Sequence, residues 1–242
     1  IRDSIMPITT KKMKTIALLV AAGHSERVGG GIPKPYIQLG GESILQHTLK
    51  LFLNHPAIDG VRVVIRREHH PYYRKAIGEL TLIPCVMGGN SRQESVRLGL
   101  ESIAHHHPER VLVHDIARPF VSKQLISRIT DALDTHKAVI PVLTITDTIK
   151  NVENGMVKNT IMREGLVRVQ TPQAFDYKTL LTAHKQAIGK NLTDDAAVCE
   201  LADIPVFTID GENENFKITT AGDLKLSLIH ISEPTRLRRI SY

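Results

Sequence analysis

The chain alternates between short apolar runs and longer stretches in which apolar residues recur at three- and four-residue spacing. The short runs predict buried strands at 15–21, 61–65, 81–86, 110–115 and 138–143. The amphipathic stretches have the helical period and predict helices at 42–55, 91–106 and 122–136. Strands that alternate with helices form βαβ units, so we expect an α/β fold with a mainly parallel sheet and helices on both faces.

Three loops follow predicted strands and carry small, polar or charged residues. They are AAGHSERVGGGIPK (21–34), GGNSR (88–92) and DIARP (115–119). Ligands of parallel sheets bind at the carboxyl ends of the strands, so we expect these loops to form the functional site together. In the second loop, Ser91 and Glu94 have the S-x-x-E spacing of a helix capping box.

The pattern changes at 144–170, where apolar and polar residues alternate around the tripeptide Glu153-Asn154-Gly155. An alternating run with a central Asn-Gly predicts a β-hairpin. We expect this inserted hairpin to be an arm that contacts a partner subunit. Beyond the arm, the pattern predicts helices at 176–188 and 193–202 and strands at 205–210 and 215–219.

The formal net charge of +6 lies mostly at the two ends of the chain. Residues 1–15 hold four basic residues and one acidic residue, and residues 226–242 hold three and one. The part between them is close to neutral, which argues against a nucleic-acid partner. Trp is absent and only 4% of the residues are aromatic, so stacking platforms for single-stranded nucleic acid are not expected either.

No apolar run approaches the length of a membrane span, and no hydrophobic leader precedes the first strand. Cys85 and Cys199 are the only cysteines, too few for a disulfide framework. We therefore expect a cytoplasmic protein with two reduced thiols and no membrane partner. The domain is predicted to span 13–225, with 1–12 as a disordered leader. We interpret 226–242 as a non-native tail, because it lacks helical periodicity and resembles a translated sequencing adapter.

The first loop does not have the spacing of the common phosphate-binding motifs. Lys34 lies between two prolines, unlike the lysine of a P-loop, and the loop lacks the G-x-G-x-x-G fingerprint. It offers instead A-A-G-x-x-x-R, followed six residues later by P-K. Small residues let a nucleotide lie against the backbone, and Arg27 and Lys34 can converge on its phosphates. This combination suits nucleotidyl transfer, in which charge builds up on phosphate oxygens. A surface loop with solvated basic residues is the alternative.

The order of short motifs along the chain resembles that of one enzyme family. AAG…R…PK is followed by GGNSRQESV, HDIARPF, DTIK, REGLVRVQTPQAF, TDDAAV and NFKIT, over about residues 14–224. This order is similar to that of the 2-C-methyl-D-erythritol 4-phosphate cytidylyltransferases of the non-mevalonate isoprenoid pathway. The resemblance implies a Rossmann-like nucleotidyltransferase fold, a homodimer formed through the arm, and transfer of CMP from CTP to a sugar-alcohol phosphate. It also implies Mg²⁺ as cofactor, bound mainly through the CTP phosphates.

Matching each motif to the family pattern assigns roles to individual residues. The implied catalytic residues are Arg27, Lys34, Arg163 and Lys217, with Lys34 as the main stabiliser of the transition state. The residues implied to bind the nucleotide are Ala21, Ala22, Gly23, Gly89, Asn90, Ser95, Asp115 and Arg118. The residues implied to complete the methylerythritol phosphate pocket are Thr148, Thr171 and Thr193. Thr148 and Arg163 would reach the substrate of the neighbouring subunit from the arm.

Three alternatives stay open. A cytidylyltransferase for another polyol phosphate, such as ribitol 5-phosphate, would share the CTP motifs and differ around Thr148, Arg163 and Lys217. A non-catalytic nucleotide- or nucleic-acid-binding protein has only the overall charge in its favour. The chain also resembles the first domain of fusions with a downstream cyclodiphosphate synthase. The sequence departs from the family pattern at Ser25, Pro35, Asn90 and Ile116.

Several polar residues have a simpler interpretation than a catalytic one. The histidine runs at 69–70 and 105–107 are predicted to lie in surface loops rather than to bind metal. His114 is predicted to pack or to orient a neighbour rather than to transfer protons. Asp194 and Asp195 are placed to favour the positive end of the following helix, and Arg92 is either phosphate-facing or solvated.

Overall fold

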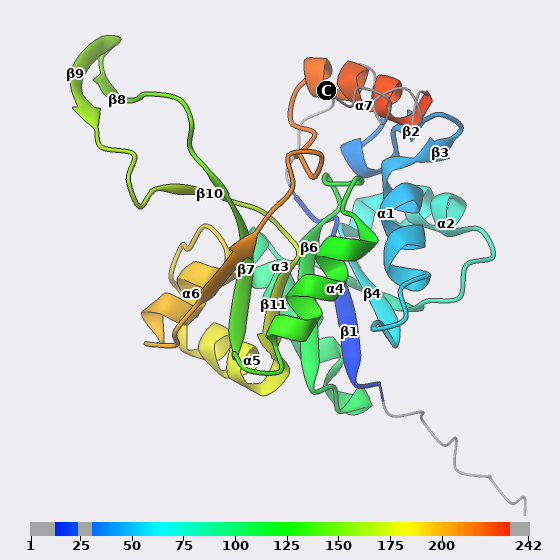
Figure 1. Ribbon diagram of the computed structural model, residues 1–242. Coiled ribbons are helices and arrows are strands. Elements are labelled where there is room, and N and C mark those ends of the chain that lie inside the picture. Colours follow the sequence, from blue (N-terminus) through cyan, green and yellow to red (C-terminus); the bar gives the residue numbers. More distant parts are fainter. Residues whose placement is uncertain (1–12, 24–30, 233–242) are drawn as a thin grey trace, which may run out of the picture.

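The computed structural model describes residues 13–23 and 31–232, and its centre is a sheet of eight strands (Figure 1). Seven strands have the spatial order β10-β7-β11-β6-β1-β4-β5, and β12 pairs with β7. Their bounds are β1 Thr15–Val20, β4 Gly60–Ile65, β5 Ile83–Met87, β6 Arg110–Asp115, β7 Ala138–Thr144, β10 Val167–Val169, β11 Gln173–Asp176 and β12 Phe207–Asp210. β10 and β11 pair antiparallel with their neighbours, and the remaining pairs are parallel. The expected α/β fold with a mainly parallel sheet is confirmed.

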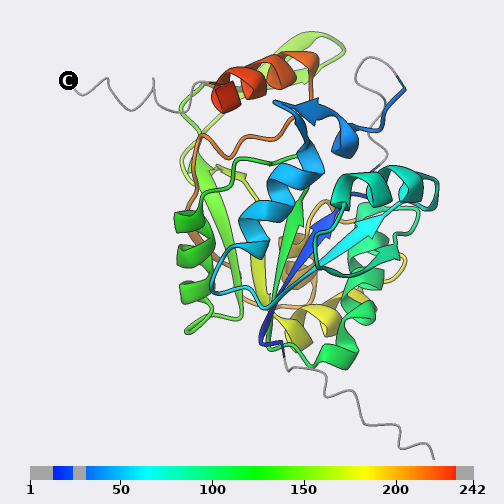
Figure 2. The ribbon, with the colours of Figure 1, turned by 90° about the vertical axis from the view of Figure 1, so that its right-hand side faces the viewer.

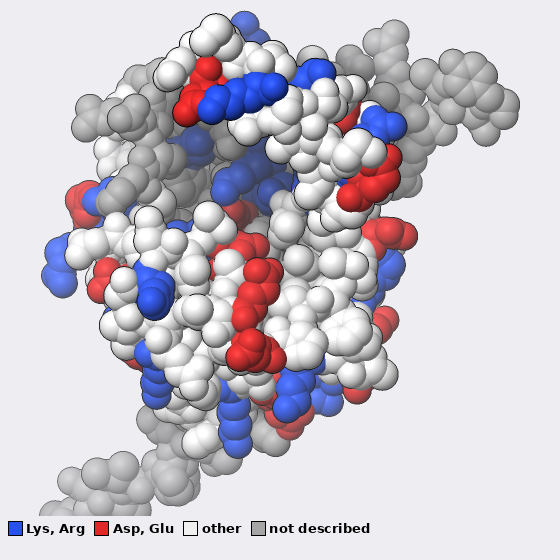
Figure 3. Space-filling view, turned by 90° about the vertical axis from the view of Figure 1, so that its left-hand side faces the viewer, with Lys and Arg blue, Asp and Glu red and all other residues white. Residues whose placement is uncertain are grey.

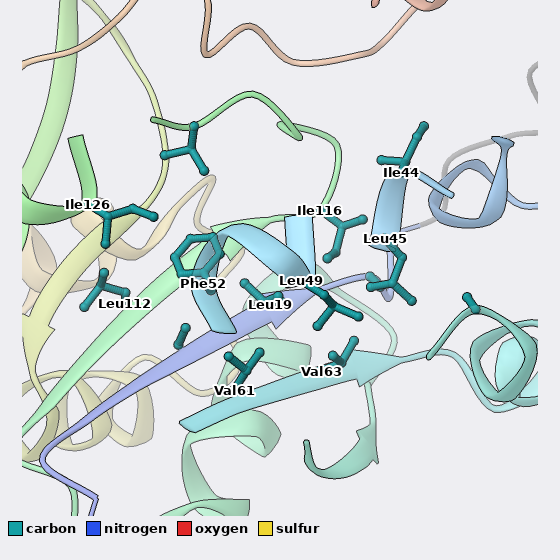
Figure 4. Close-up of a cluster of buried hydrophobic side chains, with 14 of the residues drawn as sticks. Leu19, Ile44, Leu45, Leu49, Phe52, Val61, Val63, Leu112, Ile116 and Ile126 are labelled. Carbon is teal, nitrogen blue, oxygen red and sulfur yellow. The ribbon is translucent and has the colours of Figure 1, made fainter. Parts of the chain in front are cut away.

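Helices cover both faces of the sheet, because side chains of a strand point alternately to the two sides. Leu19 of β1 packs in the apolar cluster beneath α1 (Ile44–Leu53) and α4 (Lys123–Ala132). Figure 4 shows Leu19 in this cluster, beside Leu49 and Phe52 of α1. Leu18 packs in the opposite cluster, beneath α3 (Arg92–Ser102) and α5 (Tyr177–Gln186). The sheet therefore lies between two helical layers (Figure 2).

Shorter elements complete the described chain. They are the 3-10 helices η1 Lys34–Tyr36, η2 Arg67–His69 and η3 Ala104–His106, the strands β2 Gln38–Leu39, β3 Glu42–Ser43, β8 Ile149–Glu153 and β9 Met156–Ile161, and the helices α2 His70–Ile77, α6 Asp195–Leu201 and α7 Ala221–Ser232. No helix among the described residues is long and apolar enough to cross a membrane. Cys85 and Cys199 are both free thiols.

The capping box predicted at Ser91 is only half formed. Ser91 accepts the N–H of Glu94 at 3.0 Å, as expected of an N-cap. The Glu94 carboxylate, however, accepts the N–H of Asn90 at 2.7 Å, outside the helix. Glu94 therefore holds the GGNSR loop against the start of α3. A complete capping box occurs at α1 instead, between Ser43 and Gln46.

The predicted hairpin is present as β8 and β9, which project from the body of the protein (Figure 1). Its turn is at Asn154-Gly155, where both residues have positive φ, as a tight hairpin turn requires. The hairpin is shorter than the 144–170 segment. Val167–Val169 returns to the main sheet and pairs with β7. Exposed apolar side chains, including Met156, Val157 and Met162, line the arm.

Three element predictions are wrong. The histidines at 69–70 and 105–106 lie in η2, α2 and η3 rather than in loops. Residues 215–219 form no strand; they run as a loop across the sheet edge, where the Ile218 N–H donates to the Ala117 carbonyl oxygen at 2.8 Å. The expectation that 226–242 lacks helical structure fails for 226–232, which continue α7. Apolar residues lie on several sides of α7: Ile231 packs against the core, whereas Leu226 and Leu228 are exposed. No single stripe therefore marks this helix in the sequence. The leader at 1–12 lies outside the described residues.

Candidate functional site

The carboxyl ends of β1, β5 and β6 bring the three predicted loops to one edge of the sheet. A cavity of about 170 Å³ opens there. Its lining consists of Val20, Ala21, Gly23, Lys34, Pro35, Ile44, Arg92, Asp115, Ile116, Ala117 and Lys217. On the left-hand face of Figure 1, basic side chains gather in a hollow (Figure 3). The edge is therefore suited to an anionic ligand.

Lys34 lies in the first turn after the glycine-rich loop, at the start of η1. Its ammonium donates to the carbonyl oxygens of Ile218 at 3.2 Å and Thr219 at 3.5 Å. These two bonds aim the side chain across the cavity. Burial and the nearby charge of Lys217 lower the pKa of Lys34, because both disfavour its positive charge. An anion in the cavity would relieve this imbalance.

Asp115, the last residue of β6, is shared by two cations. Its Oδ2 accepts from the Lys217 ammonium at 2.6 Å and its Oδ1 from Arg92 Nε at 3.3 Å. Burial acts to raise the pKa of this carboxyl, but Arg92 and Lys217 outweigh it and hold the pKa below its usual range. Asp115 is thus an ionised group that orients cations and cannot serve as a proton donor near neutral pH.

His114 has an orienting role, as predicted. It is fully buried, and burial lowers its pKa to about 4, so the imidazole is neutral at pH 7. One ring nitrogen, Nε2, faces the carbonyl oxygen of Arg118 at 3.0 Å and must donate to it. Nδ1 then accepts from the Thr171 hydroxyl at 3.1 Å, and Thr171 in turn accepts the Asp115 N–H at 3.1 Å. Thr171 and His114 therefore fix the position of the Asp115 backbone.

The GGNSR loop packs directly against the loop after β1. The Gly89 N–H donates to Ser95 Oγ at 3.1 Å, and Ser95 Oγ donates to the Ser91 carbonyl oxygen at 2.8 Å. A Cβ atom on Gly88 would lie 2.6 Å from the Ala22 Cβ and 2.7 Å from Ser95 Oγ. Glycine is required at this position because the two loops approach so closely. Ala22 is thereby brought beside Gly89 and Ser95.

The remaining predicted site residues are placed less centrally. Arg118 is tied by its guanidinium to the Asn215 carbonyl oxygen at 2.8 Å. Thr148 and Arg163 are exposed on the arm, where Arg163 donates to the Thr146 carbonyl oxygen. Thr193 is exposed directly before Asp194, the N-cap of α6. These residues are absent from the cavity lining given above. Arg27 lies outside the described residues.

Arg92 lines the cavity, and the sequence alone does not decide between its two interpretations. Its side chain is mostly buried, and its Nη2 donates to Asp195 at 2.8 Å. A clue exists in the sequence. Arg92 is the first residue of α3, where the helix dipole disfavours a cation, so its presence there implies an anionic partner in the fold. Arg97, by contrast, forms surface ion pairs with Glu94 and Glu101.

The fold and this edge define a nucleotidyltransferase-like α/β protein, in which fixed cations and loop backbone surround a phosphate-sized space. A family model, described as 2-C-methyl-D-erythritol 4-phosphate cytidylyltransferase, matches residues 15–232. The chain belongs to this family. The resemblance expected from the motif order is therefore confirmed.

Similar proteins agree with this assignment. The chain is 48% identical over 213 residues to the bifunctional enzyme IspD/IspF of Rhodospirillum rubrum, covering 88% of this chain and 56% of the relative. It is 43% identical over 228 residues to that of Paramagnetospirillum magneticum, covering 94% of this chain and 59% of the relative. The crystal structure of 2-C-methyl-D-erythritol 4-phosphate cytidylyltransferase from Thermus thermophilus is 33% identical, with a TM-score of 0.76 over 89% of this chain and 98% of that one. The chain thus spans a little over half the length of these two bifunctional relatives and nearly all of the Thermus chain.

Proposed function

We propose that this chain transfers CMP from CTP to 2-C-methyl-D-erythritol 4-phosphate and releases pyrophosphate. The observation that carries the proposal is the convergence of Lys34 and Lys217 on one cavity at the carboxyl edge of the sheet. The family assignment and the named activity of the Thermus relative support the choice of substrates. Nothing in the comparisons favours ribitol 5-phosphate.

In this proposal, a phosphate oxygen of methylerythritol phosphate attacks the α-phosphorus of CTP. A new P–O bond forms, and the bond to the bridging oxygen breaks with its electron pair going to pyrophosphate. The nucleophile is already anionic, so no general base is needed. Lys34, fixed by the carbonyl oxygens of Ile218 and Thr219, would stabilise the charge that builds up in the transition state. Alignment and charge neutralisation then account for catalysis.

Lys217 would bridge the two substrates in this proposal. It lines the cavity that holds Lys34 and also a second hollow of about 400 Å³ beside it. The second hollow is lined by Arg118, Leu143, Arg168, Val169, Gln170, Asn213, Phe216, Lys217 and Thr219. Its cations suit a sugar-alcohol phosphate. We assign the nucleotide to the first cavity, with Gly89, Asn90 and Ser95 at the cytosine edge, and the phosphate of the second substrate to the hollow.

Mg²⁺ is proposed to enter with the triphosphate of CTP. Among the described residues that line the cavity, Asp115 is the only carboxylate, and both of its oxygens face cations. No group of three or more His, Cys, Asp or Glu residues in the described part of the chain could hold a metal ion. These residues do not fit a protein-held magnesium, and no catalytic step here depends on one.

The arm is proposed to form a homodimer and to deliver Thr148 and Arg163 to the partner's site. Its exposed apolar side chains support this, because such a surface gains stability when a partner covers it. The two free thiols are consistent with the cytoplasm as the place of action.

The test is pyrophosphate release by the purified chain with Mg²⁺ and CTP, comparing methylerythritol phosphate with ribitol 5-phosphate. Release with methylerythritol phosphate alone, lost in Lys34→Ala, supports the proposal. Release with ribitol phosphate alone would transfer the same chemistry to another substrate and refute the stated one. No release from a folded protein that binds CTP would refute the activity.

A further inference from the structure

Five ionisable side chains form a continuous row from the interior of the protein to the candidate site. His184 Nε2 lies 3.0 Å from Asp195 Oδ1, and Asp195 Oδ2 lies 2.8 Å from Arg92 Nη2. Arg92 Nε lies 3.3 Å from Asp115 Oδ1, and Asp115 Oδ2 lies 2.6 Å from Lys217 Nζ. We call this set the charge row. It connects α5 and α6 to the end of β6 and to the loop that carries Lys217.

The charge row begins fully buried and ends half exposed. The side chains of His184 and Asp195 are 0% exposed, those of Arg92 and Asp115 are 24% and 13% exposed, and that of Lys217 is 42% exposed. Burying a charge is costly unless it is paired, so the carboxylates of Asp195 and Asp115 depend on Arg92, which holds the pKa of both below the usual range. Removing a charge at the buried end of the charge row is therefore expected to alter the position of Lys217 at the exposed end.

Hydrogen bonds fix the backbone of Asp195, so its carboxylate has a defined position at the buried end of the charge row. Its backbone N–H donates to Gln173 Oε1 at 3.2 Å, and Gln173 Nε2 donates to Asp194 Oδ2 at 2.7 Å. Asp194 in turn caps α6 through the N–H of Ala197. β11, which supplies Gln173, lies beside β6, which supplies Asp115. Arg92 therefore spans two anions whose backbones are both anchored to the sheet.

We propose that Asp195 is a positioning residue, which acts through Arg92 and Asp115 to set the place of Lys217 in the candidate site. The proposal rests on the function proposed above, because Lys217 is there assigned to the second substrate. With Asp195 in place, Arg92 divides its guanidinium between two carboxylates and leaves Asp115 Oδ2 to Lys217. Without the Asp195 charge, Arg92 has only Asp115 as an anionic partner. Arg92 then competes with Lys217 for Asp115, and the ion pair between Lys217 and Asp115 weakens.

The kinetic test is Asp195→Asn, which keeps the size of the side chain and removes its charge. We expect kcat/KM for methylerythritol phosphate to fall about ten- to hundredfold, the range for a small displacement of a positioning group, and KM for CTP to change by a smaller factor. Asp134→Asn is the matched control. It breaks the surface ion pair with Arg110 at the opposite end of β6, and should leave both parameters unchanged.

A double-mutant cycle separates positioning from a purely structural role. In a Lys217→Ala background, Asp195→Asn should cost less than twofold, because the residue on which it acts is gone. The same loss in both backgrounds, or no loss in the native background, would overturn the proposal. Should Asp195→Asn fail to fold, Arg92→Lys tests the same link, since it keeps the charge but cannot span two carboxylates. The expected kinetic pattern is the same.

Lysine acetylation followed by mass spectrometry tests the geometry without catalysis. Asp195→Asn should raise the acetylation rate of Lys217 severalfold relative to Lys50, which pairs with Glu42 far from the row. An unchanged ratio would refute the positioning role. If the native chain shows no cytidylyl transfer while this ratio rises, the proposed function fails and the link from Asp195 to Lys217 stands.

Discussion

The Lys34 ammonium donates a hydrogen bond to the carbonyl oxygen of Ile218 at 3.2 Å, across 184 positions of sequence. This bond joins the loop after β1 to the segment that carries Lys217. Two lysines that repel each other are therefore held together by backbone contacts and by Asp115. This arrangement concentrates positive charge in the cavity, which favours the binding of an anion.

We predict that Lys34→Ala lowers kcat by about 10² to 10³, the usual cost of one lost electrostatic stabiliser of a transition state. Lys34→Arg should retain more activity because it keeps the charge, although its planar fork cannot reproduce both carbonyl contacts. Steady-state kinetics at saturating CTP checks both variants. A Lys34→Ala enzyme with native kcat would contradict the assignment of Lys34.

His114 should make the protein less stable as the pH falls. Its pKa in the folded state is lowered to about 4 by burial, below the ordinary value of about 6.5. The unfolded chain then binds a proton that the folded chain does not, so stability is lost as the pH falls from about 6.5 to about 4. The loss is of the order of 3 kcal/mol over this window.

Urea unfolding at pH 7 and pH 4.5 measures this effect. The native protein should lose more stability between the two pH values than His114→Gln, which cannot titrate. His105→Gln, a change at an exposed histidine, should behave like the native protein. Equal losses in native and His114→Gln proteins would show that His114 does not supply the acid sensitivity.

Strands and helices whose own residues show a clear apolar pattern could be predicted from the sequence. β6 at Arg110–Asp115 is an example, because a buried parallel strand is a continuous apolar run. β11 could not, since it includes the buried Gln173, whose amide is satisfied by Asp194, the N-cap of α6, and by the first residues of α6. Local propensity contains no information on such a distant partner.

The candidate site likewise contains residues that the sequence predicts and one whose role depends on distant partners. The short motifs point to Lys34, Asp115 and Lys217, and the structure brings these three to one cavity. The sequence allows two interpretations of Arg92, because its partners come from β6 and from α6, 23 and 103 positions away. Only the sheet order places these segments side by side.

Gly88→Ala should weaken CTP binding. The new methyl group would meet the Ala22 Cβ and Ser95 Oγ at distances that atoms do not tolerate, so the two loops must separate. We expect KM for CTP to rise about tenfold, in line with an overpacking cost of about 1–3 kcal/mol. Gly222→Ala, whose methyl group would have 3.5 Å to its nearest neighbour, is the matched control. Unchanged CTP binding in Gly88→Ala would show that the loop contact is not needed.

The arm should hold two copies of the chain together. Met156 and Val157 are exposed on β9, and nothing in the described part of a single chain covers them. Replacing both with Lys should convert a dimer to a monomer, because the apolar contact would be lost and charges would have to be buried. Sedimentation velocity measures the change. Ile188→Lys, at an exposed apolar residue away from the arm, should stay dimeric.

This change also tests the assignment of Thr148 and Arg163 to the partner's site. If these residues act across the dimer, the monomeric variant should lose activity toward methylerythritol phosphate while it still binds CTP, because the residues that line the proposed nucleotide cavity all belong to one chain. A native chain that sediments as a monomer and is fully active would refute both the dimer and the shared site.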